Sequence, residues 1–129
     1  MIGKTIQSLL VANADLIALV PEASIFPYVL NENTPLPAIV YTIDSLSPEY
    51  TKDGWVDDAI DFSVISVHTN YAALQDIVIQ IRRALEIKKG TYDTTTIGRI
   101  ELTGMSEGFN ITENVFMNKL SFTVNKTSY

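Results

Sequence analysis

The sequence predicts an α+β fold: an antiparallel sheet of four to five strands with two helices packed on it, in the order α-(β)-β-β-α-β-β. Two segments repeat apolar residues at helical spacing, and four to five others are rich in β-branched and aromatic residues. The strand segments occur in adjacent pairs, which favours antiparallel pairing. The 129 residues suit one domain, since domains usually have ~100–150 residues, and we expect a single domain over 1–129.

The first helix is expected from about Gly3 to Ala18, where apolar residues return at helical spacing with polar residues between them. Pro21 ends it, because proline lacks a backbone N–H and restricts the residue before it. Four prolines between positions 21 and 37 then predict an irregular loop, with Ser24–Phe26 as a very short edge strand.

Two longer strands follow. Ala38–Ile43 is β-branched and aromatic, and Ala59–His68 places apolar residues on both of its faces. Such a strand is expected to be covered on both sides. Pro48, Asp53 and Gly54 mark the connection between the two strands.

The second helix has the strongest pattern in the chain. Its apolar residues from Leu74 to Leu85 follow i, i+3, i+4, i+7 spacing, and Thr69 or Asn70 can cap its first free amides. Gly90 is the expected stop. Cations gather near this end, where the helix dipole favours them: Arg82, Arg83, Lys88 and Lys89.

Two last strands, Ile97–Met105 and Phe116–Val124, complete the expected sheet. Gly108–Asn110 lies between them, so we expect a hairpin.

Composition excludes several functions. Nine Lys and Arg against fifteen Asp and Glu give a formal net charge of −6, whereas tight nucleic-acid binding needs a surplus of cations. The chain has no cysteine, which excludes disulfides, thiolate catalysis and cysteine-based metal sites. The N-terminus does not resemble a secretory signal, and no apolar stretch is long enough to span a membrane. We expect a soluble intracellular protein with no membrane partner.

Catalytic patterns are weak. Asp57, Asp58 and Asp61 have the spacing of an Asp-Asp-x-x-Asp magnesium motif, but here the motif leads into a strand, where adjacent side chains point to opposite faces. A solvated hairpin end is the favoured interpretation. His68 is the single histidine, no Gly-x-Ser-x-Gly turn accompanies it, and no glycine cluster fits a phosphate loop. We therefore expect no enzyme, no cofactor and no metal.

The segment from 44 to 61 carries the one strong charge asymmetry. It holds six acids with Lys52 as the only base between them, and it is either a soluble hairpin or a surface that repels DNA or meets a basic partner. The acids are Asp44, Glu49, Asp53, Asp57, Asp58 and Asp61.

Aromatic residues lie mostly in or beside the predicted loops and strand ends. They suit either core packing or a protein interface; they are Tyr28, Tyr41, Tyr50, Trp55, Tyr71 and Tyr92. Combined with the acidic segment, they leave five candidates for an interface or a lumen lining: Tyr50, Asp53, Trp55, Asp57 and Asp58.

Several segments carry a family resemblance over nearly the whole length. They are Leu19-Val20-Pro21 after the first helix, Ile25-Phe26-Pro27, Pro35-Leu36-Pro37-Ala38-Ile39-Val40-Tyr41, Asp53-Gly54, Phe62–His68 with the Leu74–Leu85 helix, and Leu120–Val124. In these segments the chain resembles the tail terminator, or tail completion, proteins of long-tailed bacteriophages.

This resemblance implies an α+β subunit that assembles into a ring, commonly a hexamer, which caps the finished tail tube, stops its polymerisation and joins it to the head connector. The implied partners are further copies of the chain, the tail tube protein and the head–tail connector protein. DNA would pass through the ring without specific binding. The implied location is the tail or neck of a virion assembled in the bacterial cytoplasm.

Three other hypotheses stay open from sequence. The chain could be a head-completion ring of the neck, or a homodimeric α+β module that holds a small ligand between sheet and helix. The third is a small hydrolase that uses Asp57, Asp58 or His68.

Overall fold

The structure is a computed structural model that describes residues 2–28, 35–50, 56–92 and 95–127. These residues form three α-helices, a short 3-10 helix and seven strands. In chain order they are α1 (Ile2–Ala12), α2 (Ala14–Leu19), η1 (Glu22–Ser24), β1 (Ile25–Pro27), β2 (Ala38–Tyr50), β3 (Val56–His68), α3 (Tyr71–Leu85), β4 (Gly90–Tyr92), β5 (Thr95–Ile97), β6 (Glu101–Asn110) and β7 (Val115–Thr127).

All seven described strands belong to one mixed sheet, in the order β1-β2-β3-β7-β5-β4, with β6 pairing to another part of β7. β1 runs parallel to β2, and the other pairs are antiparallel. The predicted fold of four to five antiparallel strands with two helices is therefore wrong. Its main errors are the direction of β1, the missed β4–β5 pair and the division of the first helix. The strands β1, β4 and β5 have three residues each, which is too short a pattern to predict, and the helix is divided by a cap at Asn13.

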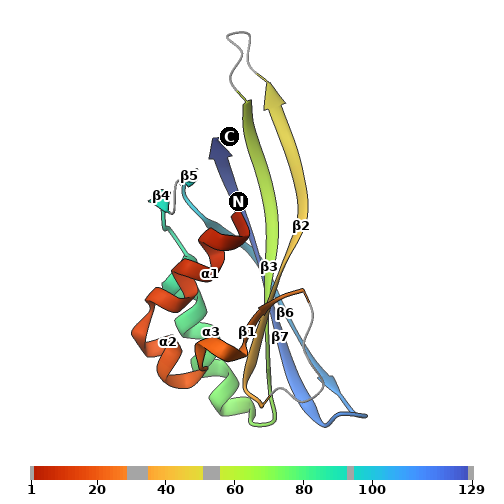
Figure 1. The fold of residues 1–129 in the computed structure, drawn as a ribbon. Coiled ribbons are helices and arrows are strands. Elements are labelled where there is room, and N and C mark those ends of the chain that lie inside the picture. Colours follow the sequence, from red (N-terminus) through yellow and green to blue (C-terminus); the bar gives the residue numbers. More distant parts are fainter. Residues whose placement is uncertain (1, 29–34, 51–55, 93–94, 128–129) are drawn as a thin grey trace.

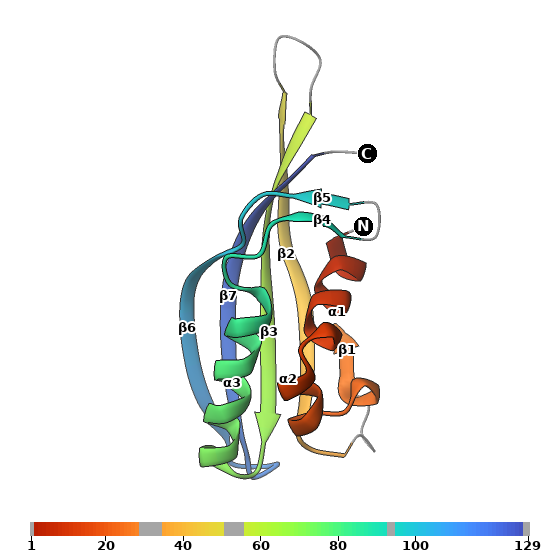
Figure 2. The ribbon, with the colours of Figure 1, turned by 90° about the vertical axis from the view of Figure 1, so that its left-hand side faces the viewer.

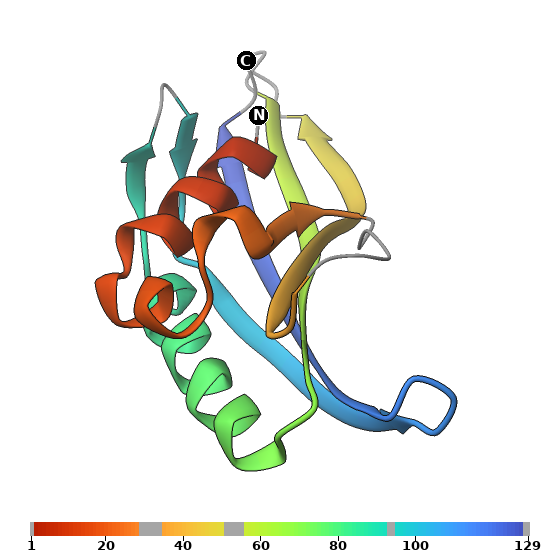
Figure 3. The ribbon, with the colours of Figure 1, turned by 60° about the horizontal axis from the view of Figure 1, so that its bottom comes forward.

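The molecule has two layers. The helices α1, α2 and α3 cover one face of the sheet, and no described helix lies on the other face (Figures 1 and 2). Seen from below, the helical layer lies to one side of the strands while the β6–β7 hairpin extends away from it (Figure 3). None of the described helices is long and apolar enough to cross a membrane.

Asn13 divides the predicted N-terminal helix into α1 and α2. Its backbone is extended, and its side-chain oxygen accepts a hydrogen bond of 3.0 Å from the Leu16 amide. Its side-chain nitrogen donates to the Gln80 carbonyl of α3 at 3.3 Å. Asparagine is a favoured N-cap because its short side chain satisfies a free amide. The bond to Gln80 also links the N-terminal helices to α3.

α3 confirms the second predicted helix. Asn70 caps it, its side chain accepting from the Ala73 amide at 3.1 Å. The helix ends at Leu85, five residues before the predicted stop, and the chain turns through Ile87 at φ 68°. Gly90, with φ 121°, begins β4 instead of ending α3.

β2 is longer than the predicted strand Ala38–Ile43 and runs through Pro48 to Tyr50. β1 pairs only with residues 39–41, so the upper part of β2 is an edge of the described sheet. Proline is tolerated on an edge because its missing N–H removes no ladder bond there. The expected Ile97–Met105 strand is instead divided, with Ile97 ending β5 and β6 beginning at Glu101 and running past the predicted hairpin turn to Asn110.

The core lies between the helices and the face of the sheet that they cover. Phe62 of β3 and Phe122 of β7 are register partners whose rings stack with centroids 5.3 Å apart. Aliphatic side chains from both layers surround this pair, and all are buried: Ile6, Leu10, Leu16, Ile60, Val64, Ile77, Ile81, Leu85, Leu120 and Val124. Alternation along the strands then fixes which residues point to the other face.

Candidate functional site

The upper halves of β2 and β3 rise past the helical layer as an antiparallel pair, and β7 lies along the other side of β3 as far as Asp57 (Figure 1). Of the five predicted interface or lumen residues, Asp53 and Trp55 lie outside the described residues. Tyr50 ends β2 and is 76% exposed. Asp57 and Asp58 lie on β3, where Asp57 is exposed and Asp58 is buried. Their side chains take opposite faces, as the strand prediction required.

Asp58 stabilises the sheet. It is the register partner of Lys126 on β7, and its carboxylate lies 3.5 Å from the Lys126 ammonium. Only 8% of the Asp58 side chain and 13% of the Lys126 side chain are exposed. A nearly buried carboxylate needs a paired charge to offset its lost hydration, so the structure accounts for Asp58 without an external partner.

The other acids of the hairpin form what we call the acidic hairpin face: Asp44, Glu49, Asp57 and Asp61, all exposed. Register and alternation place Glu49, Asp57 and Asp61 on the sheet face away from the helices. Asp44 occupies a bulge in β2 next to Ser45, the register partner of Asp61. Neither β2 nor β3 contains a lysine or arginine, so this surface is locally anionic.

Hydroxyl groups hold two of these carboxylates. Asp44 accepts hydrogen bonds from Ser63 and, at 3.0 Å, from Thr42. Asp61 accepts from Ser45 at 3.1 Å. These bonds fix the direction of both carboxylates and leave each of them able to accept further hydrogen bonds at the surface, because a carboxylate accepts about four.

Glu49 and Asp57 are directly opposite one another across the two strands. Like charges in this position repel and destabilise a strand pair. Within the described residues, no ion pair or side-chain hydrogen bond is recorded for either carboxylate. The upper end of the acidic hairpin face therefore carries an electrostatic repulsion that an added cation would relieve.

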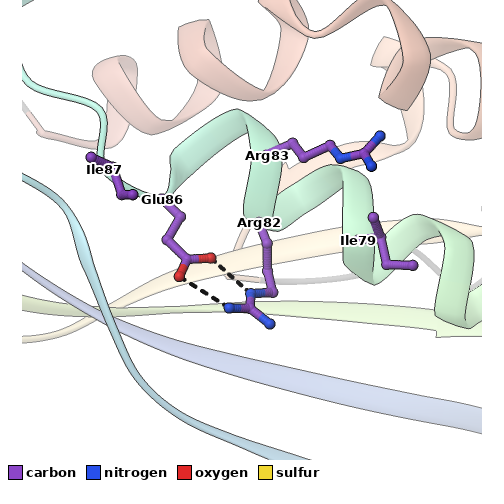
Figure 4. A pocket seen from close by; sticks show the side chains of 5 residues that line it. All are labelled: Ile79, Arg82, Arg83, Glu86 and Ile87. Carbon is purple, nitrogen blue, oxygen red and sulfur yellow. Dashed lines mark hydrogen bonds and ion pairs between the residues drawn. The ribbon is translucent and has the colours of Figure 1, made fainter.

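A second surface lies on the outer side of α3 and is called the α3 groove: Ile79, Arg82, Arg83, Glu86 and Ile87 (Figure 4). Its volume is about 410 Å³. Ile79 is 47% exposed and Ile87 is 68% exposed. The groove thus combines apolar side chains that water can reach with two guanidinium groups.

Arg82 and Glu86 form an ion pair one helical turn apart, with hydrogen bonds of 2.8 and 3.0 Å from the guanidinium to the carboxylate (Figure 4). These hydrogen bonds lower the pKa of Glu86, the guanidinium charge adds to the effect, and partial burial opposes it. The same bonds raise the pKa of Arg82. Arg82 is thereby neutralised within the chain.

Arg83 points away from that pair, toward α1 and α2 (Figure 4). It lines the α3 groove and two neighbouring hollows, one shared with Asp15 and Asp76 and one shared with Lys88. Arg83, Lys88 and Lys89 are exposed, and no ion pair is recorded for them within the described part of the chain. The end of α3 therefore presents cations beside exposed apolar side chains.

The remaining residues considered from sequence do not gather into one site. His68 is half-buried at the end of β3, where its ring nitrogen accepts from the Thr69 amide at 2.8 Å. In the part of the chain that the structure describes, no group of three metal-ligating residues occurs, and this includes Asp57, Asp58 and Asp61.

The described tyrosines divide between core and surface. Tyr41 is buried, which raises the pKa of its hydroxyl, whereas Tyr28 is 59% exposed. Tyr71 packs edge-on against Phe116, and its hydroxyl donates to Glu107. Tyr92 is partly buried and packs against the core.

The α3 groove was not predicted from the sequence. Two signals pointed to it: the cations near the end of α3, and Ile79, which lies outside the apolar stripe of the helix.

Comparisons with known proteins concern the whole fold. No model of a protein family matches the chain, and no curated protein matches its sequence. Among solved structures, the chain is similar to a chain of the "Virion of native gene transfer agent (GTA) particle", with a TM-score of 0.79 and 14% identity. The match covers 95% of this chain and 92% of that chain. This chain therefore has the fold of a component of a virion particle.

Proposed function

We propose that the chain is a structural protein of a phage-like virion, and that it forms a ring that caps the tail tube, stops its polymerisation and joins it to the head connector. The observation that carries this proposal is the shared fold over nearly the full length of a virion component. The sequence resemblance to tail terminator proteins supports the finer role. In that role the protein acts by shape and charge, without catalysis or a cofactor.

The edges of the sheet support assembly with further copies. Within the described sheet, β6 pairs with β7 on one side only, and β2 above residue 41 pairs only with β3. Unpaired strand edges are templates for association, and ring closure can cover them. β6 contains neither lysine nor proline, two residues that commonly protect such an edge.

The charge of the chain suits a passage for DNA. Each copy has a formal net charge of −6, so a ring of several copies is strongly negative. A negative wall repels the phosphate backbone and lets DNA move without adhering. In the proposed role the protein belongs to the tail or neck of a virion assembled in the bacterial cytoplasm, with the tube protein and the connector as partners.

The test adds the purified chain to the tail tube protein of the same genome while the tubes polymerise. Electron microscopy then measures tube length and the density at tube ends. We expect shorter tubes whose ends carry a ring. Tubes of unchanged length with bare ends, at concentrations where the chain is folded, would contradict the proposed function.

A further inference from the structure

We propose, on the basis of the proposed function, that the ring closes through a head-to-tail contact in which the acidic hairpin face of one copy docks on the α3 groove of the next copy. The occupant of the groove is thus a second copy of this chain. The partners in the contact are Glu49 and Asp57 on one copy and, on the other, Arg83 of the groove together with Lys88 of the neighbouring hollow that Arg83 also lines.

The two surfaces are complementary in charge. Glu49 and Asp57 repel one another across the hairpin, while Arg83 and Lys88 are exposed cations beside α3. No ion pair within the described residues compensates any of these four charges. Docking would place opposite charges together and relieve the repulsion within the hairpin.

The position of the surfaces favours a ring over a symmetric dimer. The acidic hairpin face lies on the sheet face away from the helices, whereas Arg83 lies in the helical layer (Figures 1 and 4). Because the two surfaces lie on opposite faces of the chain, a pair of copies cannot make this contact twice, as a symmetric dimer would. A contact between two different surfaces is heterologous, and it repeats from copy to copy until a rotation closes the ring.

Charge reversal tests the contact on the full 129-residue chain. Sedimentation over a concentration series at low salt measures self-association of Asp57→Lys, Arg83→Glu and the double variant. Each single reversal should weaken association by about tenfold or more. The double variant should recover most of the loss, because the introduced ammonium of one copy would then face the introduced carboxylate of the next. Reversals away from both surfaces, Arg99→Glu and Glu113→Lys, are the matched controls and should have no effect.

A disulfide test does not depend on those affinities. Because the natural chain has no cysteine, mixing Asp57→Cys with Arg83→Cys under oxidation can link only the introduced thiols. We expect cross-linked dimers in the mixture and far fewer with Glu113→Cys in place of Asp57→Cys. Thermal unfolding checks that every variant is folded. Asp57→Asn and Arg83→Gln replace any reversal that does not fold, and we expect them to weaken self-association less than the reversals do.

The outcomes separate this contact from the proposed function. Rings that form equally well in the reversed variants and the controls, or a chain that stays monomeric at low salt, overturn the contact. If the variants behave as expected while the rings leave tail tubes at full length, the contact stands and the proposed function fails.

Discussion

Neutralising Asp58 tests whether this residue stabilises the sheet instead of forming part of a surface. The Asp58→Asn variant keeps the shape of the side chain but leaves Lys126 without its charge partner at 3.5 Å. Breaking a fully buried ion pair costs about 3–5 kcal/mol. Because 13% of the Lys126 side chain reaches solvent, we expect a smaller loss of about 2–3 kcal/mol.

This loss is large enough to measure by calorimetry. For 129 residues, the entropy of unfolding is about 0.27 kcal/mol/K, so Tm should fall by about 7–11 °C. The neighbouring Asp57→Asn is the matched control, since Asp57 is exposed and surface substitutions stay within about 0.5 kcal/mol. Both variants are measured at a concentration where the chain is monomeric, because self-association, in which Asp57 is proposed to take part, also raises Tm.

A double-mutant cycle with Lys126→Met isolates the pair. The loss in the double variant should be clearly smaller than the sum of the two single losses, because the second substitution removes a charge that the first has already left unpaired. Additive losses would mean that the two side chains do not interact. Equal Tm values for Asp58→Asn and Asp57→Asn would refute the structural role of Asp58.

Three further predictions concern the helices and the core. Phe122→Ala should destabilise the chain by about 3–5 kcal/mol in chemical denaturation, because it leaves a cavity beside Phe62, and a loss under about 1 kcal/mol would contradict that packing. Asn13→Ala should cost about 1 kcal/mol by the same measurement, since it removes the cap of α2; an unchanged midpoint would show that the cap is dispensable. Glu86→Gln should make Tm fall less on acidification. The pKa of Glu86 is lower in the folded chain than its ordinary value of 4.5, so its ionised form stabilises the fold above pH 4.5. This stability is lost as the pH falls through the pKa of the folded chain. Parallel Tm–pH curves for the variant and the natural chain would count against that assignment.

Local periodicity predicted the elements that a single segment can specify. The apolar spacing of residues 74–85 and the cap at Asn70 were sufficient for α3, because a helix makes its hydrogen bonds within itself. Apolar spacing did not predict the break at Asn13, because the spacing continues across it. The break is stabilised by a bond to Gln80 in α3, which the N-terminal segment alone does not reveal.

Strand boundaries depended on partners that lie far away in the sequence. The sequence predicts a strand that ends at Ile43 and a connection that includes Pro48. In the structure β2 continues to Tyr50, because β3 pairs with it throughout and no described strand pairs with its other side above residue 41. β4 and β5 have three residues each, and so short a segment shows no alternation. Their place in the sheet follows from pairing, which the sequence of one strand does not encode.

The adjacent acids Asp57 and Asp58 mark the limit of prediction for the candidate site. Strand alternation predicts that they point to opposite faces, and they do. Alternation does not say which one is buried. That depends on Lys126, which the β3–β7 register places opposite Asp58 from 68 positions later in the chain. The pairing leaves Asp57 at the surface beside Glu49, so the same register that stabilises one carboxylate makes its neighbour available to another copy.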